Sequence, residues 1–340
     1  MKAQFQIDPP LILPLPSELS EHTVFPFLDQ MRSAIDAPEV VFDYAPIEGF
    51  SYPFGSLVLS ESIRAFAADR KTRGLVTRAR GFDEKNTKHT YLAHIGFFEH
   101  HGLHKGKKPG EAPGNSRYVP FRVLTRKSLE ATLSTGKRKL GDAIQDESNR
   151  LCSVVLGLDA PTHDHPVAYC FREIIRNVFE HAITDECYVC AQRWVNGKIE
   201  IAVVDRGRGV RASLEERYRF VDDEQALSEA VKPGVSRVDP LSQNDEDVWH
   251  NSGYGLYVLS ELARRTNGQF LLCSGGRALF CNVASKTFRS YTFKGTAVML
   301  SMTRPLGVNL RELLRKIVSE GEKAQPTDAP RPPSKSTRTI

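Results

Sequence analysis

The chain has 340 residues and a formal net charge of +5, with 40% hydrophobic and 26% charged residues. These values are ordinary for globular proteins and exclude wholesale disorder, collagen-like repeats and a long coiled coil. At roughly 100–200 residues per domain, the length predicts two domains. A net charge this small does not indicate a nucleic-acid partner, but the composition does not exclude one.

The cysteines and the N-terminus predict where the protein resides. The six cysteines are sparse and lie mostly among apolar neighbours, which is typical of free thiols in a reducing compartment. Cys187 and Cys190 have the Cys-x-x-Cys spacing, yet no second pair completes a zinc site. The N-terminal residues, which are interrupted by prolines, lack the pattern of a signal peptide. The sequence also contains no run of about 18 apolar residues, the length needed to cross a bilayer. We therefore expect a cytoplasmic protein without membrane contact.

A small α/β domain is expected over residues 37–125, after an N-terminal arm over 1–36 that ends in a short helix. The expected elements are a strand over 39–44, a helix with an apolar stripe at Leu59, Ile63, Phe66 and Ala67, a strand over 74–77 and a helix over 91–101. Histidines cluster around the end of the last helix, and without an HExxH pattern we expect surface or helix-end histidines rather than a metal site. They are His94, His100, His101 and His104.

The segment from Lys105 to Lys139 is strongly basic, with ten basic and two acidic side chains. Prolines and glycines mark its first part as a loop. We interpret it as a solvated linker, and an anion-binding or partner-docking surface remains the alternative.

A second domain is expected over 126–319, followed by a disordered tail over 320–340 that is rich in proline and charge. The expected elements are helices over 140–156 and 167–182, strands over 187–194 and 198–204, a helix over 254–265, three strands up to Met302 and a last helix after Asn309. Asn196-Gly197 between the first two strands is typical of a tight hairpin. A polar, acidic stretch over 211–251 interrupts the pattern.

One predicted helix carries a polar stripe. Glu173, Asn177 and His181 recur at every fourth position, which places a carboxylate, a carboxamide and an imidazole on one helix face. Apolar residues of the same helix remain available for burial. By itself, such a stripe also occurs on ordinary solvated helices.

Three glycine-containing segments follow. A strand ends at Asp205 and leads into Gly207 and Gly209, where glycines let a ligand approach the backbone and the carboxylate can accept a hydrogen bond from an amino group. The segment 253–256 precedes a helix whose free N–H groups favour phosphate. Finally, the Gly-Thr pair at 295–296 leads into a strand.

In this order and spacing, the four segments resemble the N, G1, G2 and G3 boxes of the GHKL ATPases, the Bergerat-fold superfamily of gyrase B, Hsp90, histidine kinases and MutL. The resemblance covers about residues 165–303. It implies an α/β, or α+β, fold class in which a Bergerat-type sandwich, a mixed sheet with helices on one face, accompanies the smaller N-terminal α/β domain. The polar stretch between the second and third boxes would be the ATP lid.

The resemblance also implies ATP and Mg²⁺ as cofactors and a role for each matching residue. Asn177 would coordinate Mg²⁺, a hard cation that takes oxygen ligands. Glu173 would deprotonate the attacking water or a protein hydroxyl. Asp205 would accept the adenine amino group, with support from Thr296. The remaining nucleotide-binding candidates are His181, Gly207, Gly209, Gly253, Gly255, Leu256 and Gly295, with Arg176 as a further phosphate contact.

Two parts of the chain fit the families less closely. Arg206 and Arg208 depart from the usual G1 box but remove no ligand group. The N-terminal pattern resembles the STAS-like fold of anti-sigma-factor antagonists, in which Ser51 or Ser56 would take the place of the phosphorylated residue. The Asp-Ser-Ser/Thr-Gly pattern usual there is absent.

The leading hypothesis is an Mg·ATP-binding protein whose slow ATP hydrolysis is coupled to a conformational change or to a protein partner, including a second copy. An alternative is an anti-sigma-like regulatory module or Ser/Thr protein kinase in which ATP binding gates partner docking. A dinucleotide enzyme is a further alternative, since residues 207–212 have the form G-x-G-x-x-A, although a hairpin rather than a βαβ unit precedes them. The least specific reading is a mixed α/β domain with coincidental glycines.

Overall fold

The computed structural model describes residues 9–133, 138–158, 165–237, 252–303, 309–325, 332–334 and 337. The chain divides into two units, Met1–Ala112 and Pro113–Ile340. The sequence predicts the boundary near residue 125 instead. The reason for the difference is β4 (Tyr118–Thr125), which pairs antiparallel with β5 (Glu186–Arg193) and so belongs to the second unit. None of the helices in the described ranges is long and apolar enough to cross a membrane.

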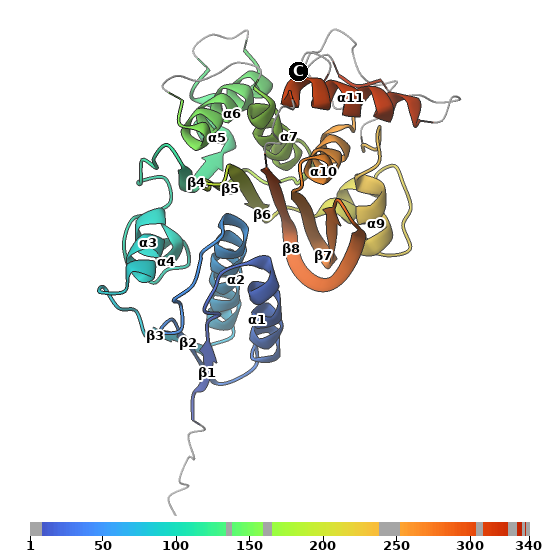
Figure 1. Cartoon of the computed structure of the whole chain (residues 1–340). Coiled ribbons are helices and arrows are strands. Elements are labelled where there is room, and N and C mark those ends of the chain that lie inside the picture. The colour runs from blue at the N-terminus through green and yellow to red at the C-terminus, as the bar shows by residue number, and fades with distance from the viewer. Residues whose placement is uncertain are drawn as a thin grey trace, which may run out of the picture. The chain divides into compact units, whose positions relative to one another are not determined.

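The first unit is built on a three-stranded parallel sheet in the order β1-β2-β3 (Figure 1). Its elements are β1 (Leu11–Pro14), α1 (Glu21–Ser33), β2 (Glu39–Asp43), α2 (Pro53–Thr72), β3 (Val76–Arg80), α3 (Thr87–Ile95) and α4 (Phe97–His100). The predicted N-terminal arm is therefore part of this unit, because β1 pairs with β2. The single helix predicted over 91–101 is two helices, since Gly96 adopts a φ of 95° between α3 and α4.

The core of the first unit contains one fully buried arginine. Arg70, in the last turn of α2, donates hydrogen bonds to the carbonyl oxygens of Ile35 and Val76 at 2.8 and 2.6 Å and to Thr77 Oγ1 at 2.9 Å. Its guanidinium also lies 5.3 Å from the ring centre of Phe66. Arg70 thus ties the end of α2 to the loop after α1 and to β3.

Two of these histidines, His100 and His101, lie at the end of α4, as the helix-end alternative predicts, and they take part in a polar network. His100 Nε2 lies 3.1 Å from Glu61 Oε2, and both side chains are almost fully inaccessible. Ser60 Oγ donates to the carbonyl of Phe97 and lies 2.8 Å from His100 Nδ1 and 3.0 Å from His101 Nδ1. This network joins α2 to the end of α4, and no group of three metal-ligating side chains forms in the part of the chain that the structure describes.

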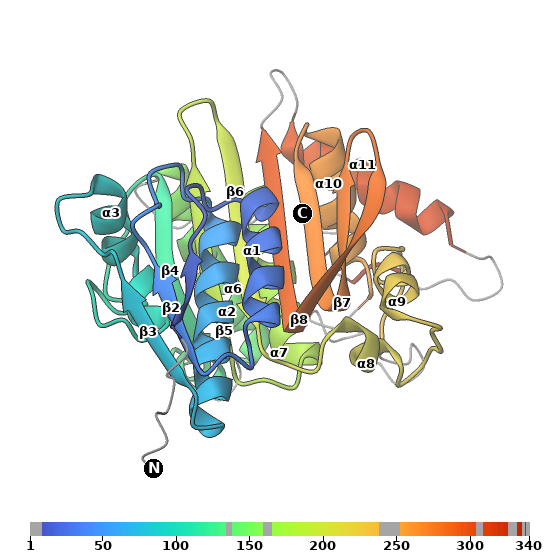
Figure 2. The ribbon, with the colours of Figure 1, turned by 90° about the horizontal axis from the view of Figure 1, so that it is seen from below.

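The second unit is built on a five-stranded sheet in the order β4-β5-β6-β8-β7. The additional strands are β6 (Lys198–Asp205), β7 (Gln269–Asn282) and β8 (Lys286–Thr303). The α+β fold class is as predicted, but the sheet is antiparallel between all its described strands, whereas a mixed sheet was expected. The three strands predicted before Met302 are the two long strands β7 and β8, which form one hairpin beside α8 and α9 (Figure 2).

Helices cover one face of this sheet. They are α5 (Arg126–Glu130), α6 (Leu140–Leu156), α7 (Pro166–His181), α10 (Gly255–Arg265) and α11 (Leu310–Lys323), with α8 (Val210–Leu214) and α9 (Asp223–Ala230) in the connection between β6 and α10. The apolar face of α7 packs on the sheet, while α10 packs on β7 and β8 (Figure 1). The disordered tail predicted from residue 320 starts too early, since α11 continues to Lys323.

Candidate functional site

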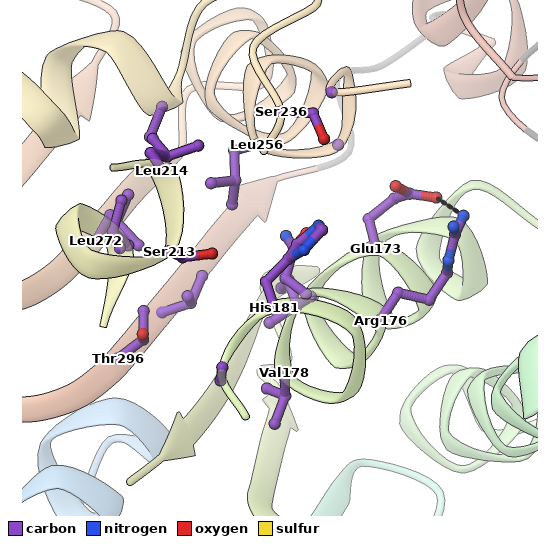
Figure 3. A pocket seen from close by; sticks show the side chains of 18 of the residues that line it. Glu173, Arg176, Val178, His181, Ser213, Leu214, Ser236, Leu256, Leu272 and Thr296 are labelled. Carbon is purple, nitrogen blue, oxygen red and sulfur yellow. Dashed lines mark ion pairs between the residues drawn. The ribbon is translucent and has the colours of Figure 1, made fainter. Parts of the chain in front are cut away.

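A pocket in the second unit collects most of the candidate residues. It lies between α7, the end of β6, the middle of β8 and the start of α10 (Figure 3). Nine of the eleven candidates line it: Glu173, Asn177, His181, Asp205, Gly209, Gly253, Gly255, Leu256 and Thr296. Arg176 lines it as well, so segments from four distant parts of the sequence meet at one cavity.

The two other candidates, Gly207 and Gly295, shape the backbone around Asp205 rather than the pocket wall. The Gly207 N–H donates to Asp205 Oδ1 at 2.7 Å, and a Cβ at Gly207 would come within 2.2 Å of the Ala182 carbonyl. Gly295 has a φ of 106°, and a Cβ there would come within 2.1 Å of the Asp205 carbonyl. Both positions therefore require glycine because neighbouring backbone fills the space of a side chain.

Asp205 is the buried carboxylate of the pocket. It ends β6 opposite Thr296 of β8, and only 4% of its surface is exposed. Burial raises the pKa of Asp205 to about 6, against the lowering effect of hydrogen bonds from Gly207 and Thr296. Among the described residues it forms no ion pair, so part of its charge is left for an external hydrogen-bond donor.

The side chain of Asn177 also has an unmet hydrogen-bonding capacity. Its Nδ2 is buried and has no hydrogen-bond partner within the described part of the chain. Because the two ends of an amide are assigned rather than observed, either its nitrogen or its oxygen can face the pocket. An orphaned amide at a pocket wall fits a group that binds a ligand.

His181 is half-buried next to three guanidinium groups. Arg237 Nε donates to His181 Nδ1 at 3.0 Å, and its other nitrogens reach the Glu180 carbonyl at 2.7 Å and Glu216 at 2.9 Å. Burial, with the positive charges of Arg237, Arg176 and Arg208, lowers the pKa of His181 to about 3. His181 is therefore a neutral imidazole, and its remaining proton is on Nε2.

Glu173 lies in the pocket beside two arginines. Its Oε1 accepts hydrogen bonds from Arg172 Nε at 3.1 Å and Nη2 at 2.9 Å, and Arg176 Nη1 is 3.9 Å away (Figure 3). Its Oε2 faces the first residue of α10, where a Cβ on Gly255 would approach it to 2.7 Å. Glu173 is thus a buried carboxylate oriented by arginine contacts rather than a mobile surface side chain.

The start of α10 forms the opposite wall. Gly253 has a φ of 74°, and a Cβ there would come within 2.5 Å of the Val235 carbonyl. Gly255 is the first residue of the helix, so backbone N–H groups of its first turn lie at the pocket. The wall between the polar ends is apolar and is formed by Val178, Val203, Leu214, Leu272 and Val298.

Several pocket residues were not predicted from the sequence. Ser236, Arg237 and Ser213 line the cavity but belong to none of the four motifs. Arg237 was included only in the long polar stretch, and no local pattern marks its contact with His181. The acidic residues Asp245, Glu246 and Asp247 of that stretch lie outside the described residues.

The cysteine pair that could suggest a metal or redox site does not form one. Cys187 and Cys190 are three residues apart on β5, so their side chains point to opposite faces of the strand. Both are free and buried, and burial raises the pKa of each thiol. They are therefore protonated and unreactive at neutral pH.

No family model matches the chain, and no curated protein matches it. The assignment of the pocket therefore depends on its own geometry.

Proposed function

We propose that the second unit is an Mg·ATP-binding module of the GHKL type, with slow ATP hydrolysis. The observation that carries this proposal is the convergence of a buried carboxylate, Asp205, and an orphaned amide, Asn177, on one pocket whose other wall is a glycine-rich helix start. Four separate motifs supply these groups, which argues against coincidental glycines.

The pocket divides into two ends with different chemistry. At the Asp205 end, a carboxylate among apolar side chains suits the amino group and flat ring of adenine. At the α10 end, backbone N–H groups and the positive end of the helix dipole suit phosphate. The pocket thus matches an amphiphilic ligand that has a base at one end and negative charge at the other.

The residues present also fit the implied cation. The oxygen of Asn177 would hold Mg²⁺, since a carboxamide oxygen is a ligand for a hard cation and Asn177 lines the pocket. When bound, Mg²⁺ and ATP would supply a neutralised triphosphate with a reactive terminal phosphoryl group. Glu173 would orient water and accept its proton, and His181 would donate one hydrogen bond from Nε2.

Nucleotide titration by calorimetry tests the proposal. ATP with Mg²⁺ is expected to bind, while GTP and NADH are expected to bind much more weakly. Asp205→Ala should abolish ATP binding, and Asn177→Ala should remove the contribution of Mg²⁺. Asp185→Ala, an exposed aspartate outside the pocket lining, is the matched control. Unchanged ATP affinity in Asp205→Ala would overturn the assignment, and tight NADH binding would favour a dinucleotide enzyme.

Measuring ATP turnover distinguishes an ATPase from the regulatory alternative. A protein that binds Mg·ATP but releases no phosphate and forms no phosphoprotein would be an ATP-gated switch, and a phosphoprotein would indicate a Ser/Thr kinase. We place the protein in the cytoplasm, for which six free, buried cysteines are the support. A protein partner or second copy, and a STAS-like first unit, remain part of the proposal.

A further inference from the structure

We propose that Arg172 is the positioning residue of Glu173: it fixes one carboxylate oxygen so that the other faces the reacting water. This inference rests on the proposed function, since it assigns the group that makes Glu173 an effective base. Arg172 itself lies outside the pocket lining and has no expected contact with the nucleotide.

The Arg172–Glu173 pair is unusual for a helix. Residues that are adjacent in a helix point about 100° apart and do not normally face each other. Nevertheless, two nitrogens of Arg172 converge on Glu173 Oε1, at 3.1 and 2.9 Å, and both side chains are buried. The arginine side chain has therefore turned back along α7 toward its neighbour.

A second set of contacts holds Arg172 in this turned position. Its Nη1 donates to Gln145 Oε1 of α6 at 3.0 Å, and its guanidinium lies 4.8 Å from the ring centre of Tyr169. Gln145 is in turn fixed by a 2.9 Å hydrogen bond from its Nε2 to Asn149 Oδ1. The orientation of Glu173 thus depends on α6, which contributes no residue to the pocket lining.

As a result, the two carboxylate oxygens of Glu173 have different surroundings and different roles. Oε1 is committed to Arg172, whereas Oε2 has no hydrogen-bond partner among the described residues and faces Gly255. A water in front of Oε2 could pass its proton to that oxygen while its own oxygen bonds to the terminal phosphorus. The electron pair of the broken P–O bond leaves with ADP, and the proton on Glu173 then returns to solvent.

The inference predicts a split between chemistry and binding. In Arg172→Met, kcat for Mg·ATP hydrolysis should fall roughly 10- to 100-fold, because a carboxylate displaced by about 1 Å loses that much. The Kd for ATP should change less than about threefold, since neither base nor phosphate contacts are removed. Arg172→Lys, which restores a cation, should recover part of kcat.

The experiment uses the full chain, with calorimetry for ATP binding, phosphate release at saturating Mg·ATP for kcat, and thermal unfolding as the folding check. Arg122→Met is the matched control, because Arg122 pairs at 3.4 Å with Glu147 of the same helix α6 but away from the pocket. If Arg172→Met does not fold, Gln145→Ala removes the anchor instead and should lower kcat by a smaller factor at constant Kd.

The remaining outcomes of this experiment separate failure of the proposed function from failure of the inference. A wild-type chain that does not bind ATP overturns the proposed function and this inference together. A wild-type chain that binds ATP without turnover overturns the inference and leaves nucleotide binding intact. The inference also fails if kcat is unchanged or higher in Arg172→Met and Gln145→Ala, or if Kd weakens in parallel with kcat.

Discussion

Arg237 donates a hydrogen bond from Nε to Nδ1 of His181 over 3.0 Å, and this contact determines which proton the imidazole carries. A guanidinium can only donate, so Nδ1 must be the acceptor and Nε2 must hold the proton. His181 therefore presents an N–H donor, not a positive charge, to its surroundings. Under the proposed function, His181 would make a neutral hydrogen bond to phosphate, and Arg176 would be the candidate for a cationic contact.

The depressed pKa of His181 predicts acid sensitivity of the second unit. The folded chain keeps His181 neutral down to a pKa of about 3, whereas the unfolded chain binds a proton near its ordinary value of 6.5. Stability should therefore fall as pH decreases below 6.5, by about 2 kcal/mol between pH 6.5 and 5 from this group. His181→Gln, which cannot titrate, should lose less stability over that range.

Urea unfolding followed by tryptophan fluorescence measures this effect, because both tryptophans, Trp194 and Trp249, belong to the second unit. His22→Gln is the control, since His22 is exposed in the first unit. Equal acid loss in His181→Gln and the wild-type chain would show that His181 is not held neutral.

Arg70 should be a principal stabilising residue of the first unit. It is fully buried and donates hydrogen bonds to backbone carbonyls of the loop after α1 and of β3. Arg70→Met leaves these carbonyls without partners, which should cost about 3 kcal/mol or more. Arg73→Met is the matched control: its ion pairs with Asp36 and Asp69 are exposed, so their loss should cost far less stability than that of Arg70. Hydrogen exchange of β2 and β3 reports on this unit, and equal protection in both variants would contradict the prediction.

Local periodicity predicted the elements that carry the site. Glu173, Asn177 and His181 were placed on one face of a helix by their spacing, and α7 (Pro166–His181) brings all three to the pocket. The glycines near Asp205 and before α10 were predicted to leave room for a ligand, but at Gly207 and Gly253 the space of a Cβ is filled by backbone of the chain itself. The helix periodicity depends on neighbours within about ten residues, whereas these backbone contacts come from more distant segments.

Non-local contacts were not predictable in this way. Tyr118–Thr125 was assigned to the first domain, because nothing in its own residues names β5 as its partner. The strand β7 continues through an irregularity at Gly275, where Asp223 accepts a hydrogen bond from the Gly276 N–H, and two long strands stand where three were predicted. The Arg237–His181 contact spans 56 residues, and no single-sequence pattern marks it.

Ile183, the second residue after α7, has a strained backbone conformation, and a substitution there should increase stability. Ile183 adopts a φ of 52°, and 76% of its surface is exposed. A β-branched side chain in this conformation costs about 1–2 kcal/mol, and so little burial does not offset the cost. Ile183→Asn should therefore stabilise the second unit by about 1 kcal/mol in the same fluorescence-detected unfolding. Val221→Asn, at an equally exposed position, should change stability by less than about 0.5 kcal/mol. A destabilised Ile183→Asn would mean that the isoleucine makes an important contact.

Asp205 predicts how adenine recognition depends on pH. An ionised carboxylate is the stronger acceptor for an amino group, so binding favours the ionised form. With a pKa of about 6 in the folded chain, Asp205 is mostly protonated at pH 5 and mostly ionised at pH 7. The affinity for adenosine should therefore rise about tenfold from pH 5 to pH 7 and then level off. Adenosine is the correct probe because it lacks the phosphate, whose own pKa near 6 would titrate in the same range.

The stability of the ligand-free chain should respond to Asp205 in the opposite direction. Its pKa is raised from 3.8 to about 6 on folding, so its contribution to stability is present below pH 3.8 and is lost as pH rises through 6. Calorimetric titration of adenosine at pH 5, 6, 7 and 8 tests the binding side of this linkage. Asp205→Asn should bind weakly at every pH, and Asp185→Asn should reproduce the wild-type profile. An affinity that is constant with pH, or tighter at pH 5, would mean that the ionised carboxylate does not accept the adenine amino group, because adenosine would then bind at least as well to the protonated acid.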